Sequence, residues 1–183
     1  MIYEFPVSVR IGDAEYQIRS DYRAVLDICT ALSDPELDDR SKAYVALTIF
    51  YPEFDDMPRD HHKEALKQCF RFINCGQEED QTRKAPKLMD WEQDFQYIVA
   101  PINRVLGKEI RAVEYLHWWT FIGAYYEIGD CLFAQIVRIR DMKARGKKLD
   151  KADQEFYRRN RHLIDLKTTY TEQEESVLNS WLR

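Results

Sequence analysis

The 183-residue sequence has no apolar run that approaches the roughly 20 residues a membrane-spanning helix needs. Its first residues carry neither the basic segment nor the apolar segment that directs export. We therefore expect a cytoplasmic protein. In a reducing cytoplasm its four cysteines are expected to be small buried thiols and not disulfides.

Motifs for catalysis and nucleotide binding are missing as well. The sequence has no G-x-S-x-G, no glycine-rich phosphate loop and no G-x-G-x-x-G after a strand. The metal-binding residue types cluster only at His61, His62, Cys69 and Cys75. Adjacent histidines point to different sides of a helix, and Cys69 falls on an apolar stripe, so we interpret this cluster as structural. We predict no enzyme activity, no metal and no cofactor.

Charge of one sign does not dominate, because the formal net charge is only -5. The charge is unevenly placed, with an acidic first third and a basic segment at residues 138–161. Clustered cations are what phosphate binding requires, so this segment is the candidate for nucleic-acid binding. Its first part, residues 138–148, lacks the interleaved aromatic side chains that stack on bases. We prefer to interpret it as a solvated face or a contact to an acidic protein surface.

Hydrophobic periodicity predicts a mainly α-helical domain of seven or eight helices with an N-terminal β-hairpin. In the hairpin, alternating apolar residues run from Phe5 to Ile11, Gly12 and Asp13 supply the turn, and the alternation resumes at Tyr16. A two-stranded hairpin alone is marginal in water. We expect it to lie on the helices or to pair with a strand of another subunit.

The helix boundaries are predicted from capping residues, prolines and glycines. Asp90-x-x-Gln93 and Thr171-x-x-Glu174 have the form of capping boxes. The Gly129-Asp130 step is consistent with a turn or with a kink. The expected helices span residues 20–33, 41–51, 58–74, 90–107, 113–128, 130–145, 150–161 and 171–182.

We treat residues 1–183 as a single domain. An alternative division separates the hairpin and three helices of residues 1–76 from an aromatic helical part at 90–183. The polar stretch 77–89 would then join the two, because it offers little to bury.

The largest apolar load lies in residues 115–126, which are aromatic around more of the helix than one buried face requires. We predict that some of these rings form core and that others meet a partner. A tryptophan close to the chain end and the first basic side chains are further candidates. The candidate partner-binding residues are Trp91, Trp118, Trp119, Tyr125, Tyr126, Arg138, Arg140, Lys143 and Trp181.

Several stretches occur in a recognisable order: Met-Asp-Trp-Glu-Gln-Asp at 89–94, Glu-Tyr-Leu-His-Trp-Trp at 114–119 and Ile-Gly-Asp at 128–130. Ile-Arg at 139–140, Gly-Lys-Lys-Leu at 146–149 and Glu-Phe-Tyr-Arg-Arg-Asn-Arg at 155–161 follow. Together they resemble the bacteriophage "gene product fifteen" family of long-tailed phages and prophages of Gram-positive bacteria. The resemblance covers most of the chain and is strongest over residues 88–167.

The resemblance implies a protein without catalytic or metal residues, encoded beside the tape-measure gene, which is the usual place of tail assembly chaperones. It implies binding of the tape-measure protein, and also of tail-tube subunits, in the cytoplasm of the bacterial host. Two alternatives are a minor structural tail or connector component of the virion, and a nucleic-acid-binding regulator acting through residues 138–161. The hairpin edge and the short helix carrying Trp181 favour a homo-oligomer.

Overall fold

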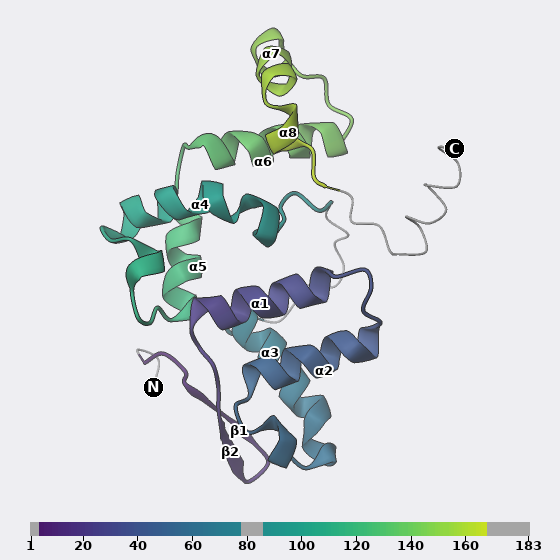
Figure 1. Ribbon diagram of the computed structural model, residues 1–183, viewed down its shortest axis with the longest axis vertical. Helices are drawn as coiled ribbons and strands as arrows, with labels where there is room; N and C mark the ends of the chain where they lie inside the picture. Colours follow the sequence, from purple (N-terminus) through teal and green to yellow (C-terminus); the bar gives the residue numbers. More distant parts are fainter. Residues whose placement is uncertain (1–3, 78–85, 168–183) are drawn as a thin grey trace. The chain divides into compact units, whose positions relative to one another are not determined.

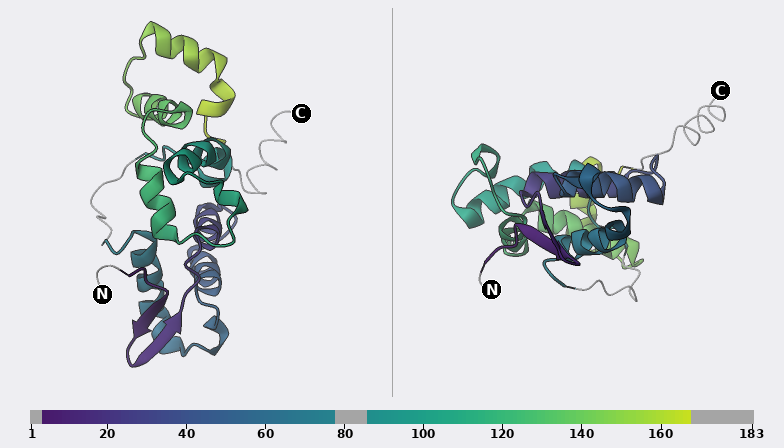
Figure 2. Two further views of the ribbon diagram at one scale, coloured as in Figure 1. Left: turned by 90° about the vertical axis from the view of Figure 1, so that its left-hand side faces the viewer. Right: turned by 90° about the horizontal axis from the view of Figure 1, so that it is seen from below.

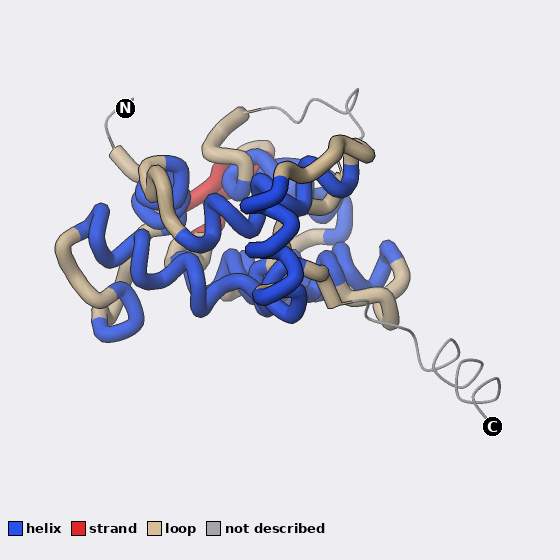
Figure 3. Tube along the Cα trace, turned by 90° about the horizontal axis from the view of Figure 1, so that it is seen from above, coloured by secondary structure: helices blue, strands red, loops and turns tan. Residues whose placement is uncertain are grey.

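The computed structural model describes residues 4–77 and 86–167, shown in Figure 1. These residues form eight α-helices, three short 3-10 helices and one antiparallel sheet of two strands. Figure 3 shows the strands in red among helices in blue. The mainly helical fold with an N-terminal hairpin is therefore confirmed.

The chain is divided into two compact units, which are described separately. Of the described residues, the first unit contains 4–77 together with 115–120. The second unit contains 86–114 and 121–167. The first unit therefore combines two separate parts of the chain, residues 4–77 and the short stretch 115–120.

The first unit begins with the hairpin. Strands β1 (Ser8–Ile11) and β2 (Ala14–Gln17) pair with Ile11 opposite Ala14. Gly12 has φ +59°, a conformation that a two-residue hairpin turn requires and that glycine adopts without steric cost. Ile11 is buried, so the apolar face of the hairpin lies against the helices. Figure 2 shows the hairpin alongside α3.

Three helices complete most of the first unit. Aspartates cap two of them: the carboxylate of Asp21 accepts from the backbone N–H of Arg23, and that of Asp38 from the N–H of Ser41. Side chains of Val25, Ile28 and other apolar residues of these helices are buried. The helices are α1 (Tyr22–Ser33), α2 (Asp39–Phe50) and α3 (His62–Ile73), with 3-10 helices η1 (Phe54–Asp56) and η2 (Arg59–His61) between the last two.

Within its described residues, the second unit has helices as its only regular elements. Its longest helix is followed by Gly107, whose φ of +67° is the left-handed conformation that a helix C-cap favours. A cluster of Ile136, Ile139 and Ile164 forms a core under the last helices. The elements are α4 (Trp91–Leu106), η3 (Ile110–Ala112), α5 (Trp118–Tyr126), α6 (Leu132–Ala144), α7 (Lys151–Arg159) and α8 (Arg161–Ile164), and the start of α5 belongs to the first unit.

Three predicted helices differ from the structure. The helix expected over 58–74 starts with the 3-10 helix η2 and is α-helical only from His62. The helix expected over 113–128 begins only at Trp118, because Leu116 and His117 are extended and pair with the chain before α1. The helix expected up to residue 161 stops at Arg159, and α8 starts anew after Asn160. The helix expected over 171–182, with Trp181, lies outside the described residues.

The start of α4 is capped, but not by the full box that the sequence predicts. Asp90 accepts from the N–H of Gln93 (Oδ1···N 3.0 Å). The reciprocal bond comes from Asp94, whose Oδ2 accepts the N–H of Asp90 at 2.9 Å. The Gln93 side chain instead donates to the C=O of Asp165 and accepts the N–H of Lys167. Gln93 therefore ties α4 to the chain after α8.

Arg140 on α6 is the most densely bonded side chain of the second unit. Its guanidinium is buried and donates to both carboxylate oxygens of Asp94, at 2.6 and 3.0 Å. The remaining bonds go to the C=O groups of Ile164, Leu163 and Leu88. A guanidinium has five N–H donors, and all five are used. Arg140 thereby joins α4, α6 and α8.

Replacing Arg140 by methionine should destabilise the protein by about 3–5 kcal/mol, because Asp94 would keep a buried charge without its partner. Urea unfolding followed by circular dichroism measures this loss. Arg145→Met is the matched control, since its ion pair with Asp141 is exposed and contributes little. Equal losses for the two variants would contradict the assignment of Arg140 as a structural centre.

None of the helices in residues 4–77 and 86–167 combines the length and apolar character that a bilayer span needs.

Candidate partner-binding surfaces

The segment before α5 is held extended by the start of α1. The N–H of Leu116 donates to the Oδ2 atom of Asp21 at 2.9 Å, and its C=O accepts the N–H of Tyr22 at 2.9 Å. The N–H of Trp118 donates to the C=O of Ser20 at 2.8 Å. These bonds replace the intrahelical bonds that a helix over these residues would make. They also fix the direction in which the aromatic side chains leave the backbone.

Trp118 and Trp119 both bond to the end of α3. The indole N–H of Trp118 donates to the C=O of Ile73, and that of Trp119 to the C=O of Phe72, each at 2.9 Å. The last carbonyl groups of a helix lack intrahelical partners, so the two indoles cap α3. Trp118 is only 2% exposed, whereas Trp119 is partly exposed. Both candidates thus have structural contacts, and Trp119 also reaches the surface.

His117 is held between the N-terminal segment and α5. The backbone N–H of Trp119 donates to Nδ1 at 3.0 Å, so Nδ1 carries no proton. Nε2 therefore carries the proton and donates to the C=O of Pro6 at 3.1 Å. Burial lowers the pKa of His117 below its usual value, although the bond to Pro6 opposes this. The ring of Phe5 stacks on the imidazole at a centroid distance of 4.4 Å.

Apolar side chains gather at the surface around this histidine. Phe5 is 54% exposed and approaches Trp119 edge-on at 6.5 Å between centroids. Val7 is also exposed. Neither Phe5 nor Val7 was a candidate from the sequence, where both served only to predict the strand. The alternating apolar pattern of the sequence begins at Phe5, before β1 itself begins. Apolar residues that belong to this pattern but precede the strand are the signal that could have identified them.

In the second unit, the aromatic candidates pack mostly against each other. Trp91 lies 5.4 Å from Tyr125 and 6.0 Å from Phe121, between ring centroids. Tyr125 also packs on Phe133 and donates its hydroxyl to the sulfur of Met89. Tyr126 is different, because it is 75% exposed. Of these rings, Tyr126 is the one whose side chain is available to a partner.

The basic candidates are all engaged within the second unit. Arg138 pairs with the buried carboxylate of Asp153, and Lys143 donates to Asp165 at 2.6 Å. Arg140 is buried against Asp94. Beyond these candidates, Arg145, Arg159 and Arg161 also have carboxylate partners. Much of the positive charge of residues 138–161 is thus neutralised locally, which does not favour phosphate binding.

The histidines and cysteines that cluster in the sequence make separate contacts in the structure. His61 bonds to the hydroxyl of Tyr16, and His62 to the C=O of Met57. Burial raises the pKa of Cys29 to about 11 and that of Cys69 to about 12, so both are held as thiols. All four cysteines are unpaired. Among the described residues, no group of three histidine, cysteine or acidic side chains is placed to hold a metal ion.

The chain matches a known protein family. The sequence model described as Bacteriophage Gp15 protein matches residues 1–166. The chain belongs to this family. Membership confirms the resemblance and identifies a bacteriophage protein. No curated protein matches the chain, and no solved structure matches it.

The two neighbouring tryptophans should differ in their effect on stability. Trp118→Ala should cost about 3–5 kcal/mol, because it removes a fully buried ring and leaves a helix carbonyl without its donor. Trp119→Ala should cost less, because that ring is partly exposed. Chemical denaturation of both variants measures the difference. The reverse order would show that the partly exposed ring carries the packing.

His117 should make stability depend on pH. Because its folded pKa is lowered, the unfolded chain binds a proton first as the pH falls below about 6.5, and stability decreases until the folded pKa is reached. His117→Gln retains a donor and an acceptor but does not titrate. Thermal melts from pH 7 to pH 5 should therefore show a smaller loss for the variant than for the wild type. Parallel curves would contradict this prediction.

Proposed function

We propose that this bacteriophage protein is a tail assembly chaperone, which holds the tape-measure protein in the host cytoplasm until tail-tube subunits polymerise around it. The observation that carries the proposal is the family match over residues 1–166, which supports a structural or assembly role in the phage. The resemblance adds the position of such genes beside the tape-measure gene. The proposed activity is binding and requires no catalysis.

The exposed aromatic side chains support a binding role. Phe5 and Tyr115 are 54% and 52% exposed in the first unit, and Tyr126 is 75% exposed in the second. Aromatic side chains are enriched where proteins bind each other and contribute much of the binding energy. A long chain that would otherwise aggregate offers many apolar contacts to such rings.

A second candidate is a minor structural component of the tail or of its connector. Family membership supports this function equally at the level of phage structure and assembly. The two candidates differ in where the protein ends up. A chaperone leaves before the particle is complete, whereas a tail component stays in it.

Two measurements test the proposal. A tagged chain, expressed with the tape-measure protein of the same phage, should keep it soluble and co-purify with it. Mass spectrometry of purified virions should find the tape-measure protein but not this chain. Failure to co-purify from a folded chain would contradict the chaperone role, and stoichiometric amounts in the virion would establish the structural alternative.

Tyr126 should contribute to this binding. Tyr126→Ala should weaken capture of the tape-measure protein about tenfold or more, because truncating a central aromatic contact costs about 2 kcal/mol or more. Tyr44→Ala is the matched control, since Tyr44 is also an exposed tyrosine, at 57%, but was not a candidate partner-binding residue. Thermal melts should be unchanged for Tyr126→Ala. Equal capture by both variants would exclude Tyr126 from the binding surface.

A further inference from the structure

The outer edge of β1 has backbone groups that bond to nothing in residues 4–77 and 86–167. The N–H of Ile18 donates to the C=O of Val7 at 3.0 Å, which sets the alternation of hydrogen bonds along the hairpin. In an antiparallel pair, every second residue directs its N–H and C=O toward the other strand and the next directs them away. Ser8 and Arg10 therefore point theirs outward. No group in the described part of the chain bonds to these four backbone groups.

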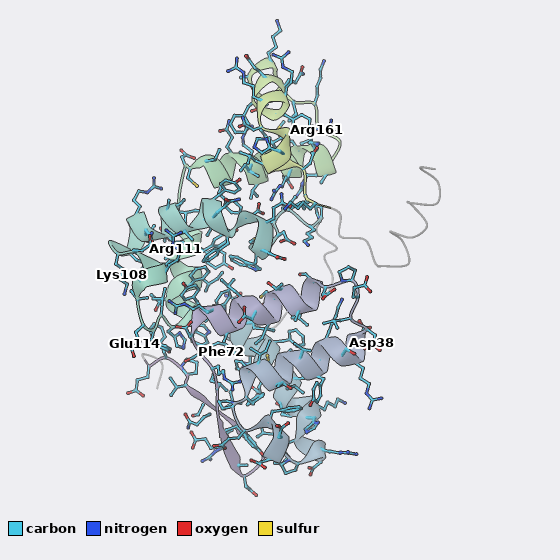
Figure 4. All side chains as sticks on the ribbon, viewed as in Figure 1. Asp38, Phe72, Lys108, Arg111, Glu114 and Arg161 are labelled. Atoms are coloured by element: carbon cyan, nitrogen blue, oxygen red, sulfur yellow. The ribbon has the colours of Figure 1, made fainter. Side chains whose placement is uncertain are left out.

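This edge lines one wall of a groove in the first unit. The opposite wall is the C-terminal part of α3, which contributes Gln68, Arg71 and Phe72, and Trp119 also lines the groove. Figure 4 labels Phe72 in this unit. Unpaired strand groups beside apolar rings are the arrangement in which an extended peptide adds a strand to a sheet, with backbone bonds for affinity and side-chain pockets for specificity.

The side chains that line the groove carry positive charge, which determines the kind of peptide that it would bind. Arg10 and Arg71 are both exposed and both line it, and none of its described lining residues is acidic. Among the residues that the structure describes, Arg71 bonds only to the C=O of Gly76, at 3.4 Å. Glu15 stands opposite Arg10 in the hairpin, but its carboxylate accepts from the hydroxyl of Ser8. Within residues 4–77 and 86–167 neither cation has a carboxylate partner, and this pair of positive charges favours an acidic segment.

We propose that the β1 edge and the C-terminal turns of α3 bind an extended, acidic segment of a partner polypeptide, which adds a third strand to the hairpin. The backbone groups of Ser8 and Arg10 pair with that strand, and the guanidinium groups of Arg10 and Arg71 bind its carboxylates. Pro6 precedes the edge and has no N–H, so the site takes a short segment. This site goes beyond the proposed function, because it does not depend on the tape-measure protein.

The test uses the full chain and a fluorescently labelled peptide of alternating glutamate and valine, followed by anisotropy. The glutamate peptide should bind, and a peptide with lysine in place of glutamate should bind at least tenfold more weakly. Methylation of alternate backbone nitrogens on the side that faces β1 should abolish binding to the unchanged protein. Equal binding of the acidic and basic peptides, or binding that survives methylation, would overturn the proposal.

Charge reversal locates the site on the protein. Arg10→Glu and Arg71→Glu should each weaken binding of the glutamate peptide about tenfold or more. Arg40→Glu, an equal charge change at an exposed residue of α2, should not. A uniform effect of all three variants would mean general electrostatic attraction and would also overturn the site.

A competition experiment distinguishes binding of a partner from binding of a segment of this protein. An unlabelled peptide of residues 168–183, which contains three glutamates, should not displace the probe. Displacement as strong as that by unlabelled probe would assign the groove to this chain's own C-terminal segment and overturn the proposal of a partner. The solution mass of Arg10→Glu should equal that of the wild type, and a lower mass would assign the edge to a second copy.

Discussion

The carboxylate of Asp21 joins parts of the first unit that lie 95 residues apart in the sequence. One oxygen caps α1 by accepting the N–H of Arg23, and the other accepts the N–H of Leu116. This second bond holds the segment before α5 extended, so that the two following indoles cap α3. The same segment presents His117 to the C=O of Pro6, which positions the chain entering β1. Trp119, which lines the groove beside β1, therefore follows a segment that Asp21 and its two chain neighbours hold in place.

Arg140 has the corresponding role in the second unit, where its five donors are divided between Asp94 and three backbone carbonyls. A buried ion pair contributes little net stability, but losing one partner costs much. The burial of Arg140 also removes from the surface one of the cations that make residues 138–161 basic in the sequence. Together with the pairs of Arg138 and Lys143, the pair of Arg140 with Asp94 engages three of these cations in bonds within the second unit.

Where the sequence carried local signals, the predictions agree closely with the structure. Asp90 caps the helix that it was expected to cap, and Gly107 ends α4 in the left-handed conformation. Gly12 and Asp13 form the hairpin turn. Such signals are reliable because a cap or a turn satisfies backbone groups only a few residues away. The resemblance to a phage family likewise rested on short ordered stretches, and the family match confirms it.

By itself, the sequence determined the fold class, most helix boundaries and the family. Only the tertiary structure decided that Leu116 and His117 leave the helical path, because the competing bonds come from Ser20, Asp21 and Tyr22. It also decided which aromatic rings stay exposed, and which edge of the hairpin is open beside α3. Helical periodicity reports what a segment can bury, but not which distant segment buries it. Hydrogen bonds between segments that are distant in the sequence decide which segment covers which.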